Sequence, residues 1–181
     1  MDERIIIAGF GGQGVMAMGQ LLAYSGMIED KWVSWLPSYG PEMRGGTANC
    51  NVIISTDPVG SPVVVEATTA IVLNKPSLDK FEESLVPGGK LFINSSLIDR
   101  KSIRDDIDVY YIPANEIANE LGNSRVANMV MLGAYLEVVQ TVDIESIERA
   151  FPKVFGESKI HLLPINKKAF ERGARAIKKK G

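Results

Sequence analysis

The glycine-rich stretch GFGGQG at 9–14 is the feature that most constrains how this chain folds. It follows the apolar, β-branched run Arg4 to Ala8, which reads as a buried strand. It precedes Val15 to Gly26, whose apolar residues recur at helical spacings and whose last glycine suits a C-cap. The stretch has the GxGxxG spacing, carried by Gly9, Gly11 and Gly14. The sequence therefore predicts a Rossmann-like first strand–loop–helix unit.

Such a loop has two uses. Its glycines let the backbone turn tightly and approach a pyrophosphate at a positive helix N-terminus, which favours an anion or nucleotide site. Alternatively, they allow close packing of the helix on the strand or against another polypeptide. A dinucleotide site also needs an acidic residue about 20 positions further on. That region carries Leu36, Pro37 and Ser38, and no GK[ST] follows Gly14 to make a Walker loop.

Strands alternate with helices for most of the chain. Further strands are expected at Trp32–Leu36, Cys50–Ser55, Ala70–Asn74, Lys90–Asn94 and Val109–Ile112, with a turn at Pro87-Gly88-Gly89. Further helices are expected at Ser77–Leu85, Ala114–Leu121, Ala127–Gln140, Ile144–Phe151 and Lys167–Lys179. This order predicts one α/β domain over 1–181, a three-layer α/β/α sandwich around a largely parallel sheet. Polar residues around Val52 to Ile54 leave room for an antiparallel strand, hence for a mixed sheet.

A second loop, PSYGPEMRGGTAN at 37–49, holds two prolines and three glycines and is expected to have no regular structure. Connections in compact α/β domains usually have about two to six residues. Long ordered loops are more often functional, so we expect a role for this one.

Single cysteine and histidine residues exclude several chemistries. Cys50 and His161 are each the only residue of their kind, so this chain alone cannot build a disulfide framework, a zinc site or an iron–sulfur site. Cys50 is expected in the core, and His161 in a short extended segment. We predict no metal site, no catalytic residue, no membrane span and no nucleic-acid platform, hence a cytoplasmic protein.

The C-terminal segment at 167–181 is strongly basic. It holds seven Lys or Arg against one Glu, and subtracting that +6 from the formal net charge of −2 leaves −8 for the rest. The segment is either a solvated helix end, where cations complement the helix dipole, or a docking patch for an acidic partner.

Together, the stretches GFGGQGVMAMGQLLA at 9–23 and PSYGPEMRGGTANCNVIIS at 37–55 resemble the gamma subunit of the 2-oxoacid:ferredoxin oxidoreductases. This family includes the pyruvate, 2-oxoglutarate and branched-chain 2-oxoacid enzymes. The resemblance also takes in SPVV at 61–64 and NMVMLGA at 128–134, so it covers essentially the whole chain. The length fits a free-standing subunit.

The resemblance implies one subunit of a multi-chain enzyme, catalytically incomplete alone. That enzyme converts a 2-oxoacid and coenzyme A to acyl-CoA and carbon dioxide and passes electrons through iron–sulfur clusters to ferredoxin. Thiamine diphosphate and the clusters belong to alpha and beta subunits, with a delta subunit as a further candidate. This chain is expected to bind no cofactor by itself. In single-chain relatives the equivalent domain adjoins the catalytic centre and helps form the coenzyme A site.

The same resemblance supplies the candidate site residues. From the first motif they are Gly9, Gly11, Gly12, Gln13 and Gly14. From the second they are Ser38, Tyr39, Gly40, Pro41, Glu42, Arg44 and Gly45, flanked by Pro37 and Gly46. Asn128 is a weaker candidate, with an N-cap or a core polar contact as its structural alternative.

Two roles stay open for these loops. Both follow strands at their carboxyl ends, so they are expected to share one edge of the sheet. Loop N–H groups and the Arg44 guanidinium suit the phosphates of coenzyme A. The competing role is subunit contact, with Tyr39 as an aromatic anchor.

Three further alternatives concern the whole protein. It could be a stand-alone nucleotide- or acyl-CoA-binding module, or the small subunit of an indolepyruvate oxidoreductase. The sequence does not separate pyruvate from 2-oxoglutarate or other substrates, because the 2-oxoacid is recognised mainly by other subunits. In isolation the chain could form a homodimer through an apolar surface that sister chains normally cover.

Overall fold

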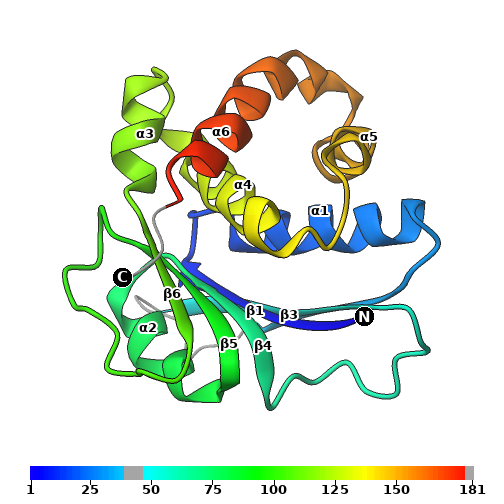
Figure 1. The fold of residues 1–181 in the computed structure, drawn as a ribbon. Coiled ribbons are helices and arrows are strands. Elements are labelled where there is room, and N and C mark those ends of the chain that lie inside the picture. The colour runs from blue at the N-terminus through cyan, green and yellow to red at the C-terminus, as the bar shows by residue number, and fades with distance from the viewer. Residues whose placement is uncertain (39–46, 178–181) are drawn as a thin grey trace.

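The computed structural model describes residues 1–38 and 47–177, and within them it has a mixed sheet of six strands (Figure 1). The strands are β1 Asp2–Phe10, β2 Trp32–Ser38, β3 Thr47–Ser55, β4 Ala67–Val72, β5 Leu85–Asn94 and β6 Asp108–Ile112. Their order across the sheet is β2-β3-β1-β4-β5-β6. Strands β1, β4, β5 and β6 are parallel, whereas β3 is antiparallel to both of its neighbours. The predicted α/β fold is confirmed, and the antiparallel member is the strand whose polar residues had left room for one.

The register places the ends of β1 and β2 at the same edge. Ala8 of β1 pairs with Asn49 of β3, and Asn49 pairs with Ser38 of β2. In a Rossmann unit the second strand lies beside the first. Here the antiparallel β3 occupies that place, so only the first strand, loop and helix are Rossmann-like.

Helices cover both faces of the sheet, as the three-layer prediction requires (Figure 1). The described α-helices are α1 Val15–Ile28, α2 Lys75–Phe81, α3 Ala114–Glu120, α4 Ala127–Val139, α5 Ile144–Phe155 and α6 Leu163–Arg175. Short 3-10 helices are η2 Glu82–Ser84, η3 Ser124–Val126 and η4 Glu157–Leu162. The layers are unequal, because α2 covers one face while α1 and α3 to α6 lie over the other (Figure 1). None of the helices in 1–38 and 47–177 has both the length and the apolar character needed to cross a membrane.

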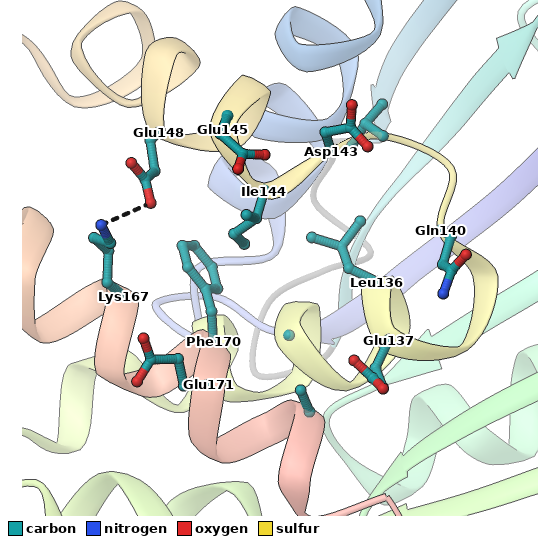
Figure 2. A pocket seen from close by; sticks show the side chains of 13 residues that line it. Leu136, Glu137, Gln140, Asp143, Ile144, Glu145, Glu148, Lys167, Phe170 and Glu171 are labelled. Carbon is teal, nitrogen blue, oxygen red and sulfur yellow. Dashed lines mark ion pairs between the residues drawn. The ribbon is translucent and has the colours of Figure 1, made fainter.

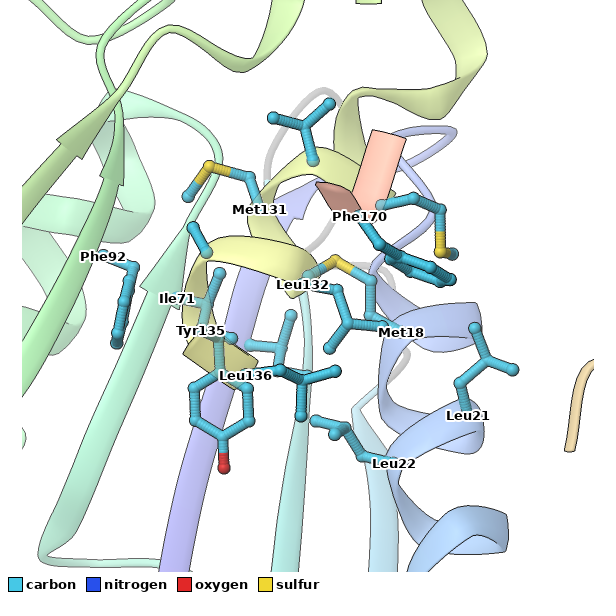
Figure 3. Close-up of a cluster of buried hydrophobic side chains, with 14 of the residues drawn as sticks. Met18, Leu21, Leu22, Ile71, Phe92, Met131, Leu132, Tyr135, Leu136 and Phe170 are labelled. Carbon is cyan, nitrogen blue, oxygen red and sulfur yellow. The ribbon is translucent and has the colours of Figure 1, made fainter. Parts of the chain in front are cut away.

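The continuous apolar run of β1 is buried on both faces, which is typical of a strand inside a parallel sheet. Ile5 and Ile7 join the larger core cluster, whereas Ile6 and Ala8 join the smaller one under α2. In the larger cluster, side chains of α1 such as Met18 and Leu22 meet those of α4 such as Leu132 and Tyr135 (Figure 3). Met129 and Met131 are buried there too.

Helices α4 and α6 cross with their backbones in contact. A Cβ on Gly133 would lie 2.6 Å from the Cα of Phe170, and a Cβ on Gly173 would lie 2.8 Å from the carbonyl carbon of Val130. Any larger residue at either position would force the helices apart, so the two glycines set their separation.

Two predictions at glycine or proline are wrong, because contacts with other elements decide the structure there. Helix α1 does not end at Gly26 but continues to Ile28, and Gly26 is needed because a Cβ there would lie 2.6 Å from Cγ1 of Val33. Pro87-Gly88-Gly89 is not a turn between elements but lies inside β5, where the register with β4 shifts. Gly88 has φ 80° and donates to the Asp106 carbonyl over 2.7 Å, so the segment is a bulge rather than a reversal.

The second predicted loop is shorter than expected at both ends. Pro37 and Ser38 extend β2, and Thr47 to Asn49 begin β3. Pro37 is tolerated because β2 is an edge strand, where a missing N–H can face away from the sheet. Helix α6 also begins before Lys167, because Pro164 suits its first turn. It ends at Arg175 with Ala176 as its C-cap, short of the predicted end at Lys179, which itself lies outside the described residues.

Candidate functional site

The glycine loop is held closed by Gln13. The Gln13 N–H donates to the Phe10 carbonyl over 3.2 Å, and its side-chain Oε1 accepts from the Phe10 N–H at 2.5 Å. Its Nε2 donates to the carbonyl of Leu73, just after β4, over 3.4 Å. Gln13 therefore fixes the loop to the end of the neighbouring strand.

The four loop glycines differ in why they must be glycine. A Cβ on Gly9 would lie 2.9 Å from the Cβ of Leu73. Gly12 and Gly14 have φ 88° and 78°, in the left-handed region that favours glycine. Gly11 has neither constraint, because a Cβ there would meet no described heavy atom within 4 Å. Packing explains Gly9 and left-handed backbone explains Gly12 and Gly14, whereas neither explains Gly11.

Asn128 joins this loop to the start of α4. It is the second residue of that helix, and its side chain is buried. Its Nδ2 donates to the Gly14 carbonyl over 3.3 Å, and its Oδ1 accepts from the Met129 N–H over 3.0 Å. Val126 occupies the N-cap position, so Asn128 is a core polar contact and not a cap.

A cavity of about 260 Å³ opens beside this contact. It lies where β4, β5 and β6 end and where the loop after β1 begins α1, which is where α/β sheets place ligands. Its lining residues are Gly12, Gln13, Leu73, Asn94, Asn115, Ser124, Arg125, Ala127 and Asn128.

The cavity wall is rich in amides that are already fixed. Asn94 Nδ2 donates to Asn115 Oδ1 over 2.8 Å, and Asn94 Oδ1 accepts from the Ala114 N–H over 3.2 Å. Asn123 Oδ1 accepts from the Arg125 N–H over 3.0 Å, which fixes the backbone that carries the arginine. These hydrogen bonds make the wall rigid.

The charge of the cavity suits an anion. The described residues that line it include no carboxylate and one cation, Arg125. The Arg125 side chain is exposed and makes no hydrogen bond or ion pair within 1–38 and 47–177. An unpaired guanidinium over neutral amides is free to make charge-assisted bonds to a phosphate or carboxylate.

Residues 4–176 match the family described as pyruvate ferredoxin/flavodoxin oxidoreductase. The chain belongs to this family. It is 41% identical over 175 residues to the ketoisovalerate oxidoreductase subunit VorA of Methanothermobacter marburgensis. The matched region covers 96% of this chain and 36% of VorA. The chain thus spans about a third of the length of that relative. It is also 34% identical over 153 residues to the 2-oxoglutarate synthase subunit KorC of Methanocaldococcus jannaschii, covering 83% and 82% of the two chains.

A solved structure of the same oxidoreductase family has the same fold. It is the gamma subunit of a keto/oxoacid ferredoxin oxidoreductase from Geobacter sulfurreducens, with 30% identity and a TM-score of 0.80 over 96% of this chain and 97% of that one. The predicted resemblance is confirmed. The alternative of an unrelated stand-alone binding module gains no support from these likenesses.

Four polar residues of the cavity were not predicted from the sequence: Asn94, Asn115, Ser124 and Arg125. The rule applied to the two loops, that ligands bind at the carboxyl ends of parallel strands, also points to Asn94 and Asn115. Arg125 lies three positions before the NMVMLGA motif. A cation so close to a family motif is the sequence feature that indicates it as a site residue.

The second motif of the oxidoreductase family is described only at its start. Ser38 lies at the same sheet edge as the glycine loop, so the strand ends meet there as expected. The other candidates lie outside the described residues: Tyr39, Gly40, Pro41, Glu42, Arg44, Gly45 and the flanking Gly46. Their roles remain predictions.

The chemistry of the single cysteine agrees with a core role. Cys50 is fully buried, its thiol donates to the Val15 carbonyl over 3.6 Å, and burial raises the pKa of the thiol to about 12. His161 is exposed in η4 and not in an extended segment, because its Nδ1 contacts the Ser158 carbonyl within that turn. With one buried cysteine, this chain does not fit an iron–sulfur cluster. Within 1–38 and 47–177, no group of three His, Cys, Asp or Glu is placed to hold a metal ion.

Part of the basic C-terminal segment of this family member is paired. Lys167 lies 3.0 Å from Glu148, Arg175 lies 4.0 Å from Glu171, and Arg172 pairs with Glu120. The charged side chains of Lys167, Arg172 and Arg175 thus pair with carboxylates on one side of α6, while Ala169 and Phe170 are buried on the other. A docking role for the segment remains a prediction, and Lys178 to Lys180 lie outside the described residues.

Proposed function

We propose that this chain works as the gamma subunit of a cytoplasmic 2-oxoacid:ferredoxin oxidoreductase and contributes to its coenzyme A site. The enzyme converts a 2-oxoacid and coenzyme A to acyl-CoA and carbon dioxide and reduces ferredoxin. Thiamine diphosphate and the iron–sulfur clusters, bound by alpha and beta subunits and a candidate delta subunit, supply the decarboxylation and electron-transfer chemistry. The relatives' names divide between ketoisovalerate and 2-oxoglutarate, so the proposal stays at the level of 2-oxoacids.

The observation that carries the proposal is that the bare Gly11 directly precedes Gly12, which lines the same cavity as Arg125. Gly11 has no internal reason to lack a side chain, which suits a backbone that a ligand approaches closely. Arg125 places an unpaired cation on the neighbouring cavity, whose described lining includes no carboxylate. Both features favour a phosphorylated ligand.

Each residue has a defined part in this proposal. The loop N–H groups near Gly11 and Gly12 bind phosphate oxygens at the start of α1, where the helix dipole favours negative charge. Arg125 pairs with a second phosphate oxygen, and Arg44 of the second motif adds another cation. The cavity of about 260 Å³ is smaller than the roughly 300–1,000 Å³ of typical ligand sites. It therefore takes only part of coenzyme A, and the rest lies against other surfaces of the assembled enzyme.

Subunit contact is the competing role for the same loop. A bare Gly11 also allows close approach of another backbone, with Tyr39 as an aromatic anchor. The two roles differ in what a side chain at position 11 would impair, namely coenzyme A binding or retention of sister subunits.

The test compares Gly11→Val, Arg125→Ala and the control Gly60→Val in the enzyme purified anaerobically through a tag on this chain. Gly60 is a suitable control because it is also exposed and a Cβ there meets no described atom within 4 Å. We expect the KM for coenzyme A in viologen reduction to rise about 10- to 100-fold for Arg125→Ala, the effect of losing a charged hydrogen bond. It should also rise for Gly11→Val, because the new side chain would block the approach of the ligand. The KM for the 2-oxoacid and the subunit composition should stay unchanged. Lost subunits with an unchanged KM would favour the contact role, and a tagged chain that retains no oxidoreductase subunits would contradict the gamma-subunit proposal.

A further inference from the structure

A second, larger cavity of about 520 Å³ lies between α4, α5 and α6 (Figure 2). Its floor is apolar, formed by the buried side chains of Leu136, Val142 and Phe170. Gly133 also lines it and contributes no side chain. It is open to solvent beside the exposed Ile144.

The rim of this cavity is strongly acidic (Figure 2). Its charged residues are Glu137, Asp143, Glu145, Glu148, Glu171 and Lys167. Five carboxylates against one ammonium give a net charge of −4, which is more negative than the −2 of the whole chain. Lys167 is already paired with Glu148 at 3.0 Å. We call this cavity with its rim the acidic groove.

Three rim carboxylates make no hydrogen bond or ion pair among the described residues, those of Glu137, Asp143 and Glu145, and two of them lie on helices. Glu137 and Glu145 are exposed, and within 1–38 and 47–177 neither side chain makes a hydrogen bond or an ion pair. They come from different helices, α4 and α5, on either side of the apolar floor. A ligand that paired with both would have to cross that floor.

The arrangement selects one kind of occupant. Carboxylates around the groove repel anions such as phosphorylated ligands. They do not form a metal site, because the described residues hold no cluster of three acidic or metal-binding side chains. An apolar floor with dispersed negative charge at its rim is complementary to a polypeptide segment in which Lys or Arg flank an apolar side chain.

We propose that the acidic groove docks such a basic–apolar segment from a partner subunit of the oxidoreductase. An apolar side chain of the segment packs on Leu136 and Phe170, and its flanking Lys or Arg pair with Glu137 and Glu145. The identity of the partner rests on the proposed function. The groove itself is separate from the coenzyme A candidate, because Asn128 and Leu136 lie eight residues apart along α4, about 12 Å.

The first test reverses the charges of the two helical carboxylates, Glu137 and Glu145. Glu137→Lys/Glu145→Lys and the matched control Glu66→Lys/Glu157→Lys are introduced into the tagged chain in its native host. The control residues are also exposed, without a described partner, and outside the groove. Subunit retention is measured by size-exclusion chromatography and quantitative mass spectrometry over a salt series.

We expect the groove variant to weaken retention of one partner subunit at least about tenfold and to flatten its salt dependence, whereas the control changes retention less than about twofold. Equal retention by both variants would overturn the inference and leave the gamma-subunit proposal intact. Failure of the unsubstituted chain to retain any partner would instead contradict the gamma-subunit proposal. Glu137→Gln/Glu145→Gln should give an intermediate loss, which separates charge pairing from a folding defect.

A photo-crosslinking experiment identifies the occupant. p-Benzoylphenylalanine replaces Glu137 in the assembled enzyme, with the same substitution of Glu157 as a control. The expected crosslink from position 137 is to a partner-subunit peptide with Lys or Arg within about three residues of an apolar side chain. A crosslink to an acidic peptide, to a second copy of this chain, or to nothing while the complex stays intact would overturn the proposal.

Discussion

The side-chain amide of Asn128 donates a hydrogen bond to the backbone carbonyl of Gly14 over 3.3 Å and so connects the first turns of α4 and α1. The two residues are 114 positions apart. Gly14 is in the left-handed conformation at the N-cap of α1, and a Cβ on it would overlap the Asn128 amide. The hydrogen bond from Asn128 therefore depends on residue 14 having no side chain.

This relationship predicts coupling between substitutions at the two positions. Gly14→Ala should destabilise the chain by about 2–4 kcal/mol, because it combines left-handed strain with overpacking. Asn128→Ala should cost about 1 kcal/mol through the lost hydrogen bond. The double variant should lose at least about 1 kcal/mol less stability than the two single variants together, because the small residue at 128 removes the overlap. Urea unfolding of all four proteins measures the cycle, and additivity within about 0.5 kcal/mol would show that the two residues do not share this space.

Glu82 predicts loss of stability in acid. Its buried carboxylate accepts from the Ser102 hydroxyl at 2.5 Å, the Ile103 N–H at 2.8 Å and Arg100 at 2.8 Å. Burial by itself raises the pKa of Glu82, but the hydrogen bonds from Ser102 and Arg100 outweigh it and the pKa lies below the ordinary 4.5. The folded state therefore binds fewer protons than the unfolded state in this range, so the stabilisation is present above pH 4.5 and is lost as pH falls through the lowered pKa.

Glu82→Gln is the corresponding variant, with Glu83→Gln as the exposed control from the same turn. At pH 7 we expect Glu82→Gln to cost about 1–3 kcal/mol and the control less than about 0.5 kcal/mol. Denaturant unfolding between pH 7 and pH 3 should show the difference from the native chain shrinking towards acid. A difference that stays constant with pH would mean that the charge of Glu82 contributes nothing.

Glu3 predicts the opposite pH dependence. Burial raises the pKa of its carboxyl above 4.5, and the hydrogen bond from the Thr69 hydroxyl only partly opposes this. The folded state thus keeps the proton to higher pH than the unfolded state, and the free energy of unfolding decreases as pH rises from 4.5 through the raised pKa. Glu3→Gln keeps an acceptor for Thr69 without the buried charge. It should be more stable than the native chain at pH 7 and flatter with pH, as thermal unfolding in matched buffers would measure. Lower stability of Glu3→Gln at pH 7 would contradict the prediction, and Glu66→Gln is an exposed control.

Local features of the sequence predicted the first unit and the strands well, because β1, the glycine loop and α1 are contiguous and their patterns are local. The same reasoning failed where distant residues decide. Gly26 looked like a helix end, yet Val33 of the next strand explains it. Pro87-Gly88-Gly89 looked like a turn, yet the contact of Gly88 with Asp106 makes it a bulge.

The residues of the candidate site also differ in whether a local sequence pattern identifies them. Gly9, Gly12 and Gly14 belong to a local motif that sequence spacing finds. Asn94 and Arg125 come to the cavity from different elements, and only the sheet order brings them together. The acidic groove depends on the angle and closeness of α4 and α6, which no spacing in either helix encodes by itself.

The contact of α4 and α6 gives the last prediction. In an isolated helix, replacing glycine by alanine stabilises by about 1 kcal/mol. At Gly133 the sign should reverse, because the new methyl group would lie 2.6 Å from the Cα of Phe170, and backbone cannot move aside as a flexible side chain can. We expect Gly133→Ala to cost about 2–3 kcal/mol, of the size that overpacking produces, and Gly173→Ala to cost a similar amount.

Because both glycines belong to one helix contact, the double variant should cost clearly less than the sum: the first methyl group already separates the helices that the second would push apart. Gly60→Ala, at an open position, should stay within about 0.5 kcal/mol of the native chain. Urea unfolding of the four variants tests this. Stabilisation by Gly133→Ala would mean that α4 and α6 lie further apart than described, and the acidic groove between them would then lose its floor.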